Sequence, residues 1–339
     1  MNSAVSKDEG RHAAEPGLRE RILELFFQAD GGVLSGEDLS QKLGVTRAAV
    51  WKHMRHLRDA GYGIEAVPSR GYRLCSWPDL LLPAAIRGGL LPGQVVGRQV
   101  DYHEQLGSTN QQAQMLAEQG AVEGTVVVAE EQSSGRGRLG RHWVSPSGVN
   151  LYTSVVLRPR LSLLEVPQLT FLVAVAVARA LEQVAQVRVT VKWPNDILLG
   201  GHKIAGLLNE LSAETEGVHY VVLGIGVNLN MRAEQFPSDL RYPATSVLLA
   251  TGRPVSRIAF AQQLYAQLDQ LYHLMLEKGF TPIRLAWESL FDLVGRTVQV
   301  DLGRELVAGT VLGIAGDGAL LLQVGSEVKT IYAGDVRPC

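Results

Sequence analysis

Two short clusters of residues carry side chains that commonly handle anions. The first cluster, from Gly135 to Arg141, alternates glycine with arginine, and the second reads Lys192-Trp193-Pro194-Asn195-Asp196, followed by Lys203-Ile204-Ala205-Gly206. Glycines let backbone amides lie against an anion, while arginines add fixed charge and planar donor groups. A solvated basic turn explains the first cluster equally well when it is taken alone. The two clusters together predict a site for phosphate or carboxylate.

Lysine is scarce in this chain, which draws attention to the second cluster. There are 25 arginines and 7 lysines, and between His53 and Glu277 the only lysines are Lys192 and Lys203. A flexible point charge beside a reacting phosphoryl or carboxyl group is a chemical reason to keep lysine where arginine is otherwise used. Chance is the alternative, because the counts are small.

Length and composition limit the class of protein and the number of domains that this chain can form. With 339 residues, 46% of them hydrophobic and 19% charged, we expect a globular, cytoplasmic protein of two or three domains. No apolar run reaches the roughly 20 residues that span a membrane, and the polar residues 1–17 predict a disordered tail without a leader. Cys75, Cys339 and the eight histidines lack ligand spacing, so no protein-built metal site is expected.

The chain has a local basic patch although its net charge is −2. Seven basic and two acidic residues lie between Gln41 and Arg73, which gives this segment a charge of +5. Such a patch favours contact with nucleic acid.

The elements around the patch predict a winged helix-turn-helix domain over residues 18–76. Apolar residues at helical spacing predict a first helix from Leu18. Ser35 and Thr46 are N-caps for a second helix and for a basic third helix that ends near Ala60. A hairpin, or wing, follows, with an arginine near its tip. The residues predicted to contact DNA are Thr46, Arg47, Lys52, Arg55 and Arg70. A three-helix protein-interaction module is the alternative.

Prolines and glycines, which interrupt helices and strands, recur over residues 77–100. They predict a linker with a short helix around Leu80–Ile86, followed by a domain over residues 101–292. The latter mixes strand and helix patterns, which predicts an α+β fold with a mostly antiparallel sheet and helices on one face. The expected strands are 125–130, 150–157, 187–193, 196–199, 204–211 and 220–229, and the expected helices are 108–118 and 166–184. Gly224 and Gly226 lie within an expected strand, which predicts that a ligand or another backbone segment approaches the strand closely there. Rossmann and P-loop motifs are absent from the sequence.

These motifs together resemble the family of bifunctional biotin–protein ligases that also repress biotin-synthesis genes. The resemblance is carried by Ser108-Thr109-Asn110, Gln132, Gly135 to Arg141, Trp143, Asn150-Leu151-Tyr152, Lys192 to Asp196, Lys203 to Gly206, and Gly224 to Asn228. Leu139 departs mildly from the family loop, which often has arginine or glycine there. The resemblance implies a central sheet with helices like that of class II synthetases and biotin–lipoate ligases. It also implies a small SH3-like β-barrel over residues 293–339.

The resemblance implies a two-step reaction. Biotin and ATP first form biotinoyl-adenylate, and a lysine of a biotin carboxyl carrier protein then attacks the mixed anhydride, with Mg²⁺ assisting at the triphosphate. Lys203, Arg138 and Asp196 are the implied catalytic residues. Biotin-binding residues by the same resemblance are Ser108, Thr109, Asn110, Gln132, Arg136, Gly137, Arg138, Lys203 and Gly206. The adenylate-binding residues are Gly135, Arg136, Arg138, Arg141, Trp143, Lys192, Asn195 and Asn228.

The resemblance also implies regulation. The adenylate-loaded protein would form a homodimer through a sheet edge and bind operator DNA of biotin genes. The Gly135–Arg141 loop would be disordered without ligand, and Trp143 would close over adenine once the loop is ordered. Trp193 and Pro194 are interpreted as a strand-ending turn with a buried indole. Two alternatives stay open at this point: a lipoate–protein ligase, and a transcription factor whose central domain only senses its ligand.

Overall fold

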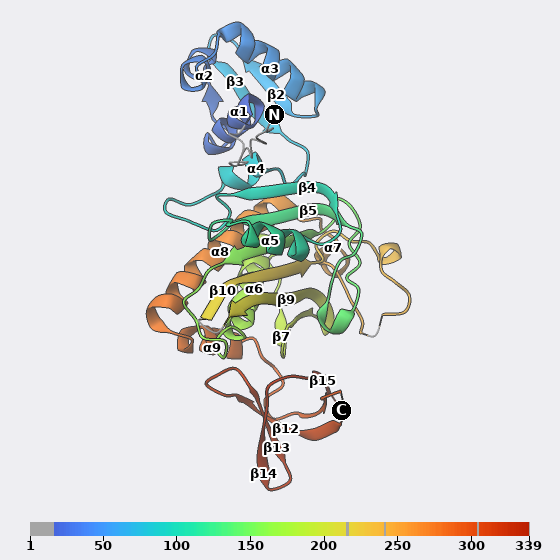
Figure 1. Ribbon diagram of the computed structural model, residues 1–339. Coiled ribbons are helices and arrows are strands. Elements are labelled where there is room, and N and C mark those ends of the chain that lie inside the picture. Colours follow the sequence, from blue (N-terminus) through green and yellow to red (C-terminus); the bar gives the residue numbers. More distant parts are fainter. Residues whose placement is uncertain (1–16, 215–216, 241, 304, 339) are drawn as a thin grey trace, which may run out of the picture. The chain divides into compact units, whose positions relative to one another are not determined.

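The computed structural model describes residues 17–338, except for residues 215, 216, 241 and 304. The predicted tail over residues 1–17 therefore lies outside the described residues, apart from Gly17, and so does Cys339. The chain divides into two compact units, one ending at Pro78 and one beginning at Asp79. Figure 1 gives the labels of their elements.

The N-terminal unit contains the three predicted helices, α1 (Leu18–Gln28), α2 (Gly36–Leu43) and α3 (Arg47–Asp59). The hydroxyl of Ser35 accepts a 2.9 Å bond from the amide of Asp38, and that of Thr46 a 3.2 Å bond from the amide of Ala49. Gly44 ends α2 at a φ of 66°, a conformation that favours glycine. Both predicted N-caps and the tight turn between α2 and α3 are therefore confirmed.

A small antiparallel sheet completes this unit. Its strands, β1 (Val33–Leu34), β2 (Gly63–Val67) and β3 (Gly71–Ser76), lie in the order β1-β3-β2. The hairpin of β2 and β3 is the predicted wing, and Arg70 is exposed at its tip. The three helices bury Ile22, Phe26, Leu39 and Met54 together. The helices and the wing thus share one apolar core, which leaves the basic side of α3 exposed.

A seven-stranded mixed sheet forms the centre of the C-terminal unit, in the order β4-β5-β6-β10-β9-β8-β7. Its strands are β4 (Val100–Leu106), β5 (Val126–Gln132), β6 (Leu151–Leu157), β7 (Thr190–Lys192), β8 (Asp196–Leu199), β9 (His202–Glu214) and β10 (Gly217–Val227). Only β4 and β5 run parallel, so the predicted mostly antiparallel pairing is confirmed. The sequence analysis does not identify β4.

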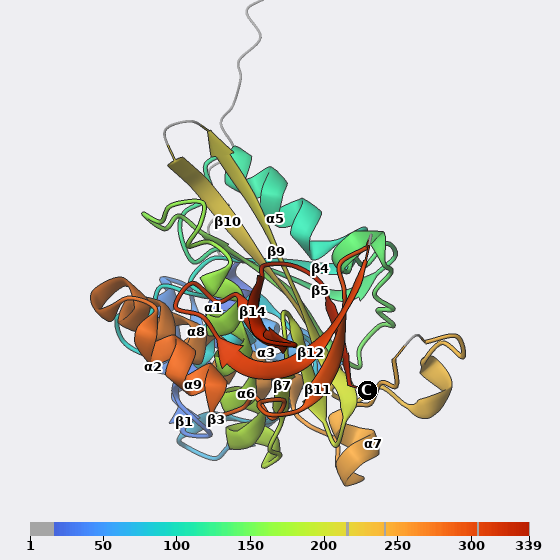
Figure 2. The same cartoon turned by 90° about the horizontal axis from the view of Figure 1, so that it is seen from below.

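Helices cover both faces of this sheet, so the prediction of helices on one face is wrong. Figure 2 shows α5 (Thr109–Glu118) on one side of β9 and β10, and α6 (Gln168–Ala185), α8 (Arg257–Lys278) and α9 (Thr281–Glu288) on the other. Strand residues alternate accordingly: Val127 and Val222 pack with α5, whereas Val126 and Leu223 belong to the larger core with α6 and α8. The physical reason is that three neighbouring strands, β5, β6 and β10, bury side chains on both faces.

Residues 79–99 contain a helix, α4 (Pro83–Gly88), that packs against α8. Leu81 and Ile86 are fully buried, and Asp79 accepts a 3.0 Å bond from the buried guanidinium of Arg257. The same guanidinium bonds Glu130 at the end of β5 at 2.6 Å, and Glu130 also accepts from the amide of Leu81. The ion pairs of the buried Arg257 with the buried Glu130 and the exposed Asp79 therefore fix the start of the C-terminal unit to its sheet.

Helix α6 is long and apolar enough to cross a membrane by length and composition. In this unit 67% of it is buried, and it packs between the sheet and α8. Its hydrophobicity is accounted for by the core, and its bounds agree with the helix expected over residues 166–184.

The last part of the chain forms a five-stranded antiparallel sheet in the order β14-β13-β12-β11-β15. Its strands are β11 (Thr297–Asp301), β12 (Leu306–Ile314), β13 (Leu320–Val324), β14 (Glu327–Ile331) and β15 (Asp335–Pro338). The indole of Trp193 is buried after β7 and donates a 3.1 Å bond to the carbonyl of Gly318. The interpretation of Trp193 as a buried, strand-ending residue is confirmed.

Candidate functional site

A cavity of about 560 Å³ opens in the C-terminal unit where several loops meet the sheet. Its lining includes the start of α5, the end of β5, the 136–144 loop, the turn between β7 and β8, glycines of β9 and β10, and the segment 231–244. This volume lies within the usual range for a small-molecule site. The predicted site residues that line it are Ser108, Thr109, Asn110, Gln132, Arg136, Gly137, Arg138, Arg141, Trp143, Asn195, Asp196, Lys203, Gly206 and Asn228. Gly135 and Lys192 are not among its lining residues.

One wall of the cavity is a buried network of neutral polar side chains. The amide oxygen of Gln132 accepts from the backbone amide of Thr109 at 2.9 Å and from its hydroxyl at 3.2 Å. The hydroxyl of Ser154 lies 2.8 Å from the Thr109 hydroxyl and 2.6 Å from the amide oxygen of Asn110, and its single proton can be donated to either. Because each group is held by another, the wall presents fixed donors and acceptors to the cavity.

Ser108 stands at the N-cap position of α5, but its side chain makes no capping hydrogen bond. The bond from the Thr109 amide to Gln132 satisfies one of the free amides of the first turn instead. The side chain of Ser108 is thus not committed to capping, although the residue is only 4% exposed.

The glycine–arginine loop is folded back on itself. The amide of Gly137 donates to the carbonyl of Arg141 at 2.7 Å, and the amide of Trp143 donates to the carbonyl of Gly135 at 2.9 Å. A Cβ on Gly135 would lie 2.3 Å from that tryptophan's carbonyl oxygen, so glycine is required there. Leu139 is 80% exposed at the loop tip with a φ of 58°. Gly135 therefore shapes the loop from outside the cavity.

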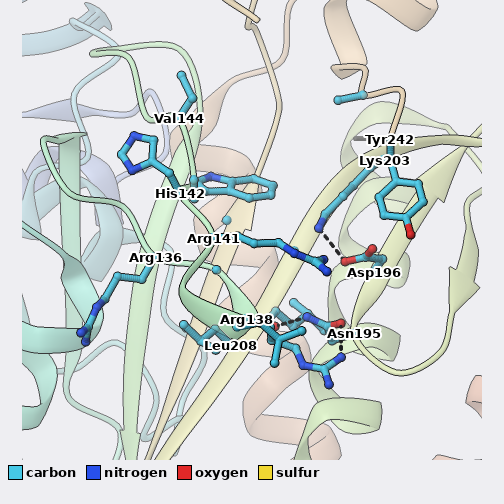
Figure 3. A pocket seen from close by; sticks show the side chains of 18 of the residues that line it. Arg136, Arg138, Arg141, His142, Val144, Asn195, Asp196, Lys203, Leu208 and Tyr242 are labelled. Carbon is cyan, nitrogen blue, oxygen red and sulfur yellow. Dashed lines mark hydrogen bonds and ion pairs between the residues drawn. The ribbon is translucent and has the colours of Figure 1, made fainter. Parts of the chain in front are cut away.

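The three arginines of the loop have partners on three different elements. Arg136 lies 3.6 Å from the Glu210 carboxylate on β9, and Figure 3 shows its side chain directed away from Lys203. Arg138 donates a 3.0 Å bond to the amide oxygen of Asn195, and burial lowers the pKa of its guanidinium. The third, Arg141, forms a 3.1 Å ion pair with the carboxylate of Asp335 on β15. The loop is thus held by electrostatic contacts on several sides.

The two singled-out lysines lie close to carboxylates of the same region. The ammonium of Lys203 is 2.6 Å from Asp196, as Figure 3 shows, and 5.4 Å from the centre of the Trp143 ring. Lys192 lines a smaller adjacent cavity of about 130 Å³ together with Asp196 and Lys203. Its ammonium is 3.5 Å from Asp335, and burial lowers its pKa. Lys203 thus faces the main cavity, whereas Lys192 lies beside it.

Two predicted close approaches at glycines of β10 are confirmed. A Cβ on Gly224 would lie 2.2 Å from the amide oxygen of Asn110, and one on Gly226 would lie 2.7 Å from the Trp143 indole. The same indole lies against Gly206 of β9, at 2.9 Å from its ideal Cβ position. Small residues on neighbouring strands therefore create the space that both side chains occupy.

Sequence reasoning missed several residues of the cavity, and two of them, Tyr242 and Asp335, contact the predicted cations. The Asp335 carboxylate accepts a 2.9 Å bond from the Tyr242 hydroxyl and pairs with Arg141 and Lys192. Burial raises the pKa of Asp335, but the bonds from Tyr242 and Arg141 and the charge of Lys192 outweigh this, so the net pKa is lowered. Neither residue belongs to a local motif, because one lies in a loop and the other in the last strand.

Comparison with known proteins agrees with this geometry. A profile of the Biotin/lipoate A/B protein ligase family matches residues 102–228, an HTH domain profile matches residues 18–73, and a Biotin protein ligase C terminal domain profile matches residues 293–337. Bifunctional ligase/repressor BirA of Bacillus subtilis is 41% identical over 320 residues, which cover 94% of this chain and 98% of that protein. The chain belongs to the bifunctional ligase/repressor family.

Two further comparisons connect this family member to biotin. Biotin--[acetyl-CoA-carboxylase] ligase of Paracoccus denitrificans is 37% identical over 232 residues, which cover 68% of this chain and 96% of that protein. The solved biotin protein ligase from Aquifex aeolicus in complex with biotin and ATP has a TM-score of 0.63 and 29% identity, over 71% of this chain and 100% of that one. The resemblance and the α+β fold class inferred from the sequence are therefore confirmed.

In this family member the predicted DNA-contacting residues lie in the N-terminal unit. Thr46 caps α3, Arg47 lies 3.8 Å from the Glu37 carboxylate, and Lys52 and Arg55 are exposed on α3. Arg70 is exposed at the wing tip, as described above. A surface ion pair such as that of Arg47 is weak and can be exchanged for a contact with phosphate.

Proposed function

We propose that this chain joins biotin to a lysine of a biotin carboxyl carrier protein at the expense of ATP, through biotinoyl-adenylate, and that it represses biotin-synthesis genes. Membership of the bifunctional ligase/repressor family supports both activities. The observation that carries the enzyme proposal is one cavity with a neutral polar wall and, elsewhere in its lining, Lys203, Arg138 and Asp196. This combination suits a ligand with a neutral polar head and an anionic tail.

The polar wall suits the ureido head of biotin. A ureido group offers two N–H donors and one carbonyl acceptor, so it needs acceptors and donors at fixed positions. Ser108, Thr109, Asn110 and Gln132 supply both kinds of group, and most are held by neighbours within 3.2 Å. Gly206 and Gly137 would give the apolar part of biotin room close to the backbone. Biotin would therefore be recognised chiefly by neutral hydrogen bonds at its head.

The cationic groups suit the first chemical step. A carboxylate oxygen of biotin attacks the α-phosphorus of ATP, the bond to pyrophosphate breaks, and biotinoyl-adenylate forms. Two anions approach each other in this step, so Lys203, Arg138 and Arg136 would stabilise the charge that builds up. Arg136 would have to exchange Glu210 for the substrate. The remaining adenylate contacts would come from Arg141, Asn195 and Asn228, whereas Gly135 and Lys192, which do not line the cavity, would act by shaping the loop and by adding charge from beside it.

Trp143 and the loop around it would enclose the adenylate. The indole nitrogen is buried and has no hydrogen-bond partner among the described residues, so a ligand acceptor beside it would satisfy this donor. We propose that the loop is mobile without ligand, that it becomes ordered on binding, and that Trp143 then covers the adenine. Closure would protect the mixed anhydride from water.

Magnesium fits the cavity as an ion that is bound mainly by the phosphates of ATP. Mg²⁺ prefers oxygen ligands and commonly binds through one or two carboxylates together with substrate phosphates and water. The carboxylates of Asp196, Asp239 and Asp335 are among the lining groups. Asp196 and Asp335 already contact Lys203 and Lys192, so they can offer the ion only part of its coordination shell. The ion would offset the negative charge of the triphosphate.

In the second step the amine of the carrier lysine attacks the acyl carbon, an amide bond forms, and AMP leaves. The amine must first lose a proton, because the free pKa of lysine is about 10.4. We propose that Asp196 receives or orients this proton while it holds Lys203 at 2.6 Å. This role is abandoned if Asp196→Asn preserves adenylate formation and shows a normal transfer rate across the pH range.

We further propose that the adenylate-loaded chain forms a homodimer through an edge of the central sheet and then binds operator DNA with two copies of α3. Two-fold operators are read by two-fold proteins, which favours this arrangement. Both activities would take place in the cytoplasm. If the loaded protein stays monomeric and does not bind the promoter of the biotin genes, the regulatory proposal fails.

Mass spectrometry of a carrier domain tests the enzyme proposal directly. The purified chain is mixed with ATP, Mg²⁺, biotin and the carrier domain, and the carrier is weighed. A gain of one biotin that is lost with Lys203→Ala supports the ligase. Binding of biotin without transfer would favour the ligand-sensing transcription factor, and transfer of lipoate in place of biotin would favour a lipoate ligase. No binding of biotin would overturn the proposal.

A further inference from the structure

The largest exposed aromatic side chain on α3 is Trp51, which is 56% exposed. Trp51 is not among the residues predicted to contact DNA. It lies one helical turn from Arg47 and one turn from Arg55, so the three residues form a stripe with four-residue spacing along the helix. All three are exposed, whereas Val50 and Met54 face the core of the N-terminal unit. The indole is therefore the apolar centre of a basic stripe.

A single exposed apolar residue on a protein surface usually needs no explanation. Trp51 differs because of its place in the fold. Helix α3 follows the Gly44 turn of the helix-turn-helix, and its first residue, Arg47, comes directly after the Thr46 cap. In this motif the N-terminal residues of the second helix lie against base edges in the major groove. Trp51 is the fifth residue of α3, so its side chain shares this region with Arg47.

The charge around Trp51 identifies the partner. Residues 41–73 carry a net charge of +5, and Arg47, Lys52 and Arg55 surround the indole on α3. A hydrophobic protein partner would leave these cations without counter-charges, whereas duplex DNA supplies phosphates beside apolar and polar base edges. An indole can contact the methyl group of thymine, and its N–H can donate to acceptors in the major groove.

We propose that Trp51 contacts base edges in the major groove and contributes to the choice of operator sequence, while the arginines on either side of it bind phosphate. This inference rests on the proposed repressor function. It predicts that the indole and the arginines have different effects on DNA binding. Loss of the indole reduces discrimination between sequences, whereas loss of an arginine weakens binding to all sequences alike.

The test uses the full chain loaded with biotin and ATP, and a library of random-sequence DNA duplexes. Wild type, Trp51→Ala, Trp51→Phe and Arg47→Gln are each used to select and sequence bound duplexes. The enriched duplex and a scrambled one are then titrated at several salt concentrations. Biotin transfer to a carrier domain is the control for folding, and we expect it to be unchanged because Trp51 lies outside the catalytic unit.

We expect Trp51→Ala to lower the affinity ratio between the enriched and scrambled duplexes about tenfold, with the salt dependence unchanged. Trp51→Phe keeps an aromatic face and should preserve more of the ratio. Arg47→Gln should lower both affinities and reduce the salt slope by about one. If Trp51→Ala selects the same sequence with the same ratio, the inference is overturned. If wild type itself enriches no sequence, the repressor function fails first.

Discussion

Removal of Lys203 should abolish most of the adenylation activity. Lys203→Met keeps an unbranched stem but deletes the ammonium that lies 2.6 Å from Asp196 and faces the main cavity. Loss of one preorganised donor at a developing charge costs about 3–4 kcal/mol, or about 10²- to 10³-fold in rate. Biotin-dependent exchange of pyrophosphate into ATP measures this half-reaction without the carrier. We expect its rate to fall by that factor.

Asp196→Asn should have a smaller effect on the same half-reaction. The amide still accepts a hydrogen bond from Lys203, but a bond between opposite charges becomes a bond with one charge. The difference between these two kinds of hydrogen bond is about 1–1.5 kcal/mol, which corresponds to about tenfold in rate. We expect Asp196 to act on adenylation only through its contact with Lys203, so the double variant should exchange pyrophosphate about as slowly as Lys203→Met alone.

The double variant is also the control for folding. Lys203→Met leaves the Asp196 carboxylate, whose side chain is only 14% exposed, without its cation, and this lowers stability. The double variant removes that charge, so its unfolding midpoint should lie above that of Lys203→Met. The reasoning is refuted if Lys203→Met exchanges pyrophosphate within about fivefold of wild type, a loss of less than about 1 kcal/mol, or if Asp196→Asn is the slower single variant.

Three further outcomes follow from buried contacts. Glu130→Gln should lower the free energy of unfolding by about 1–3 kcal/mol, measured with denaturant, because the buried guanidinium of Arg257 keeps its ion pair with Asp79 but loses the one with Glu130; a loss below about 0.5 kcal/mol would contradict this. The pKa of Asp335 is lowered in the folded chain, so its ionised carboxylate adds to the free energy of unfolding near neutral pH. This contribution disappears as the pH falls through the lowered pKa and the carboxylate is protonated. The gap in unfolding free energy between wild type and Asp335→Asn should therefore close in acid, and a gap independent of pH would argue against it. Gly224→Ala should weaken biotin binding at least tenfold in calorimetry, because its Cβ would overlap the amide oxygen of Asn110 at 2.2 Å, and unchanged affinity would show that this wall does not bind biotin.

Much of the fold is readable from local sequence. The caps at Ser35 and Thr46, the turn at Gly44 and the apolar stripes of the first helices each involve residues only a few positions apart, so the N-terminal unit could be predicted closely. The strands of the central sheet were also mostly located. Strands β1 and β4 and helices α8 and α9 went unpredicted, and helices cover both faces of the central sheet because β5, β6 and β10 bury side chains on both faces.

The candidate site was readable only in part. The motifs named most of the residues that line the cavity, because glycine and arginine in a loop, or lysine in a lysine-poor chain, signal anion chemistry by themselves. They could not indicate that Lys192 lies beside the cavity or that Tyr242 and Asp335 belong to it. These positions depend on how loops and the last strand pack, which no local spacing encodes.

The sequence by itself therefore determined most of the elements, most of the residues of the candidate site and the family resemblance. Tertiary structure decided the partners of each charge: Arg138 pairs with Asn195, which lies 57 positions away, and Arg141 with Asp335, which lies 194 positions away. The physical reason is the separation along the sequence over which each interaction acts. Capping and helical or strand periodicity act between neighbouring residues, whereas an ion pair depends on the distance between two groups after the sheet and its loops have packed.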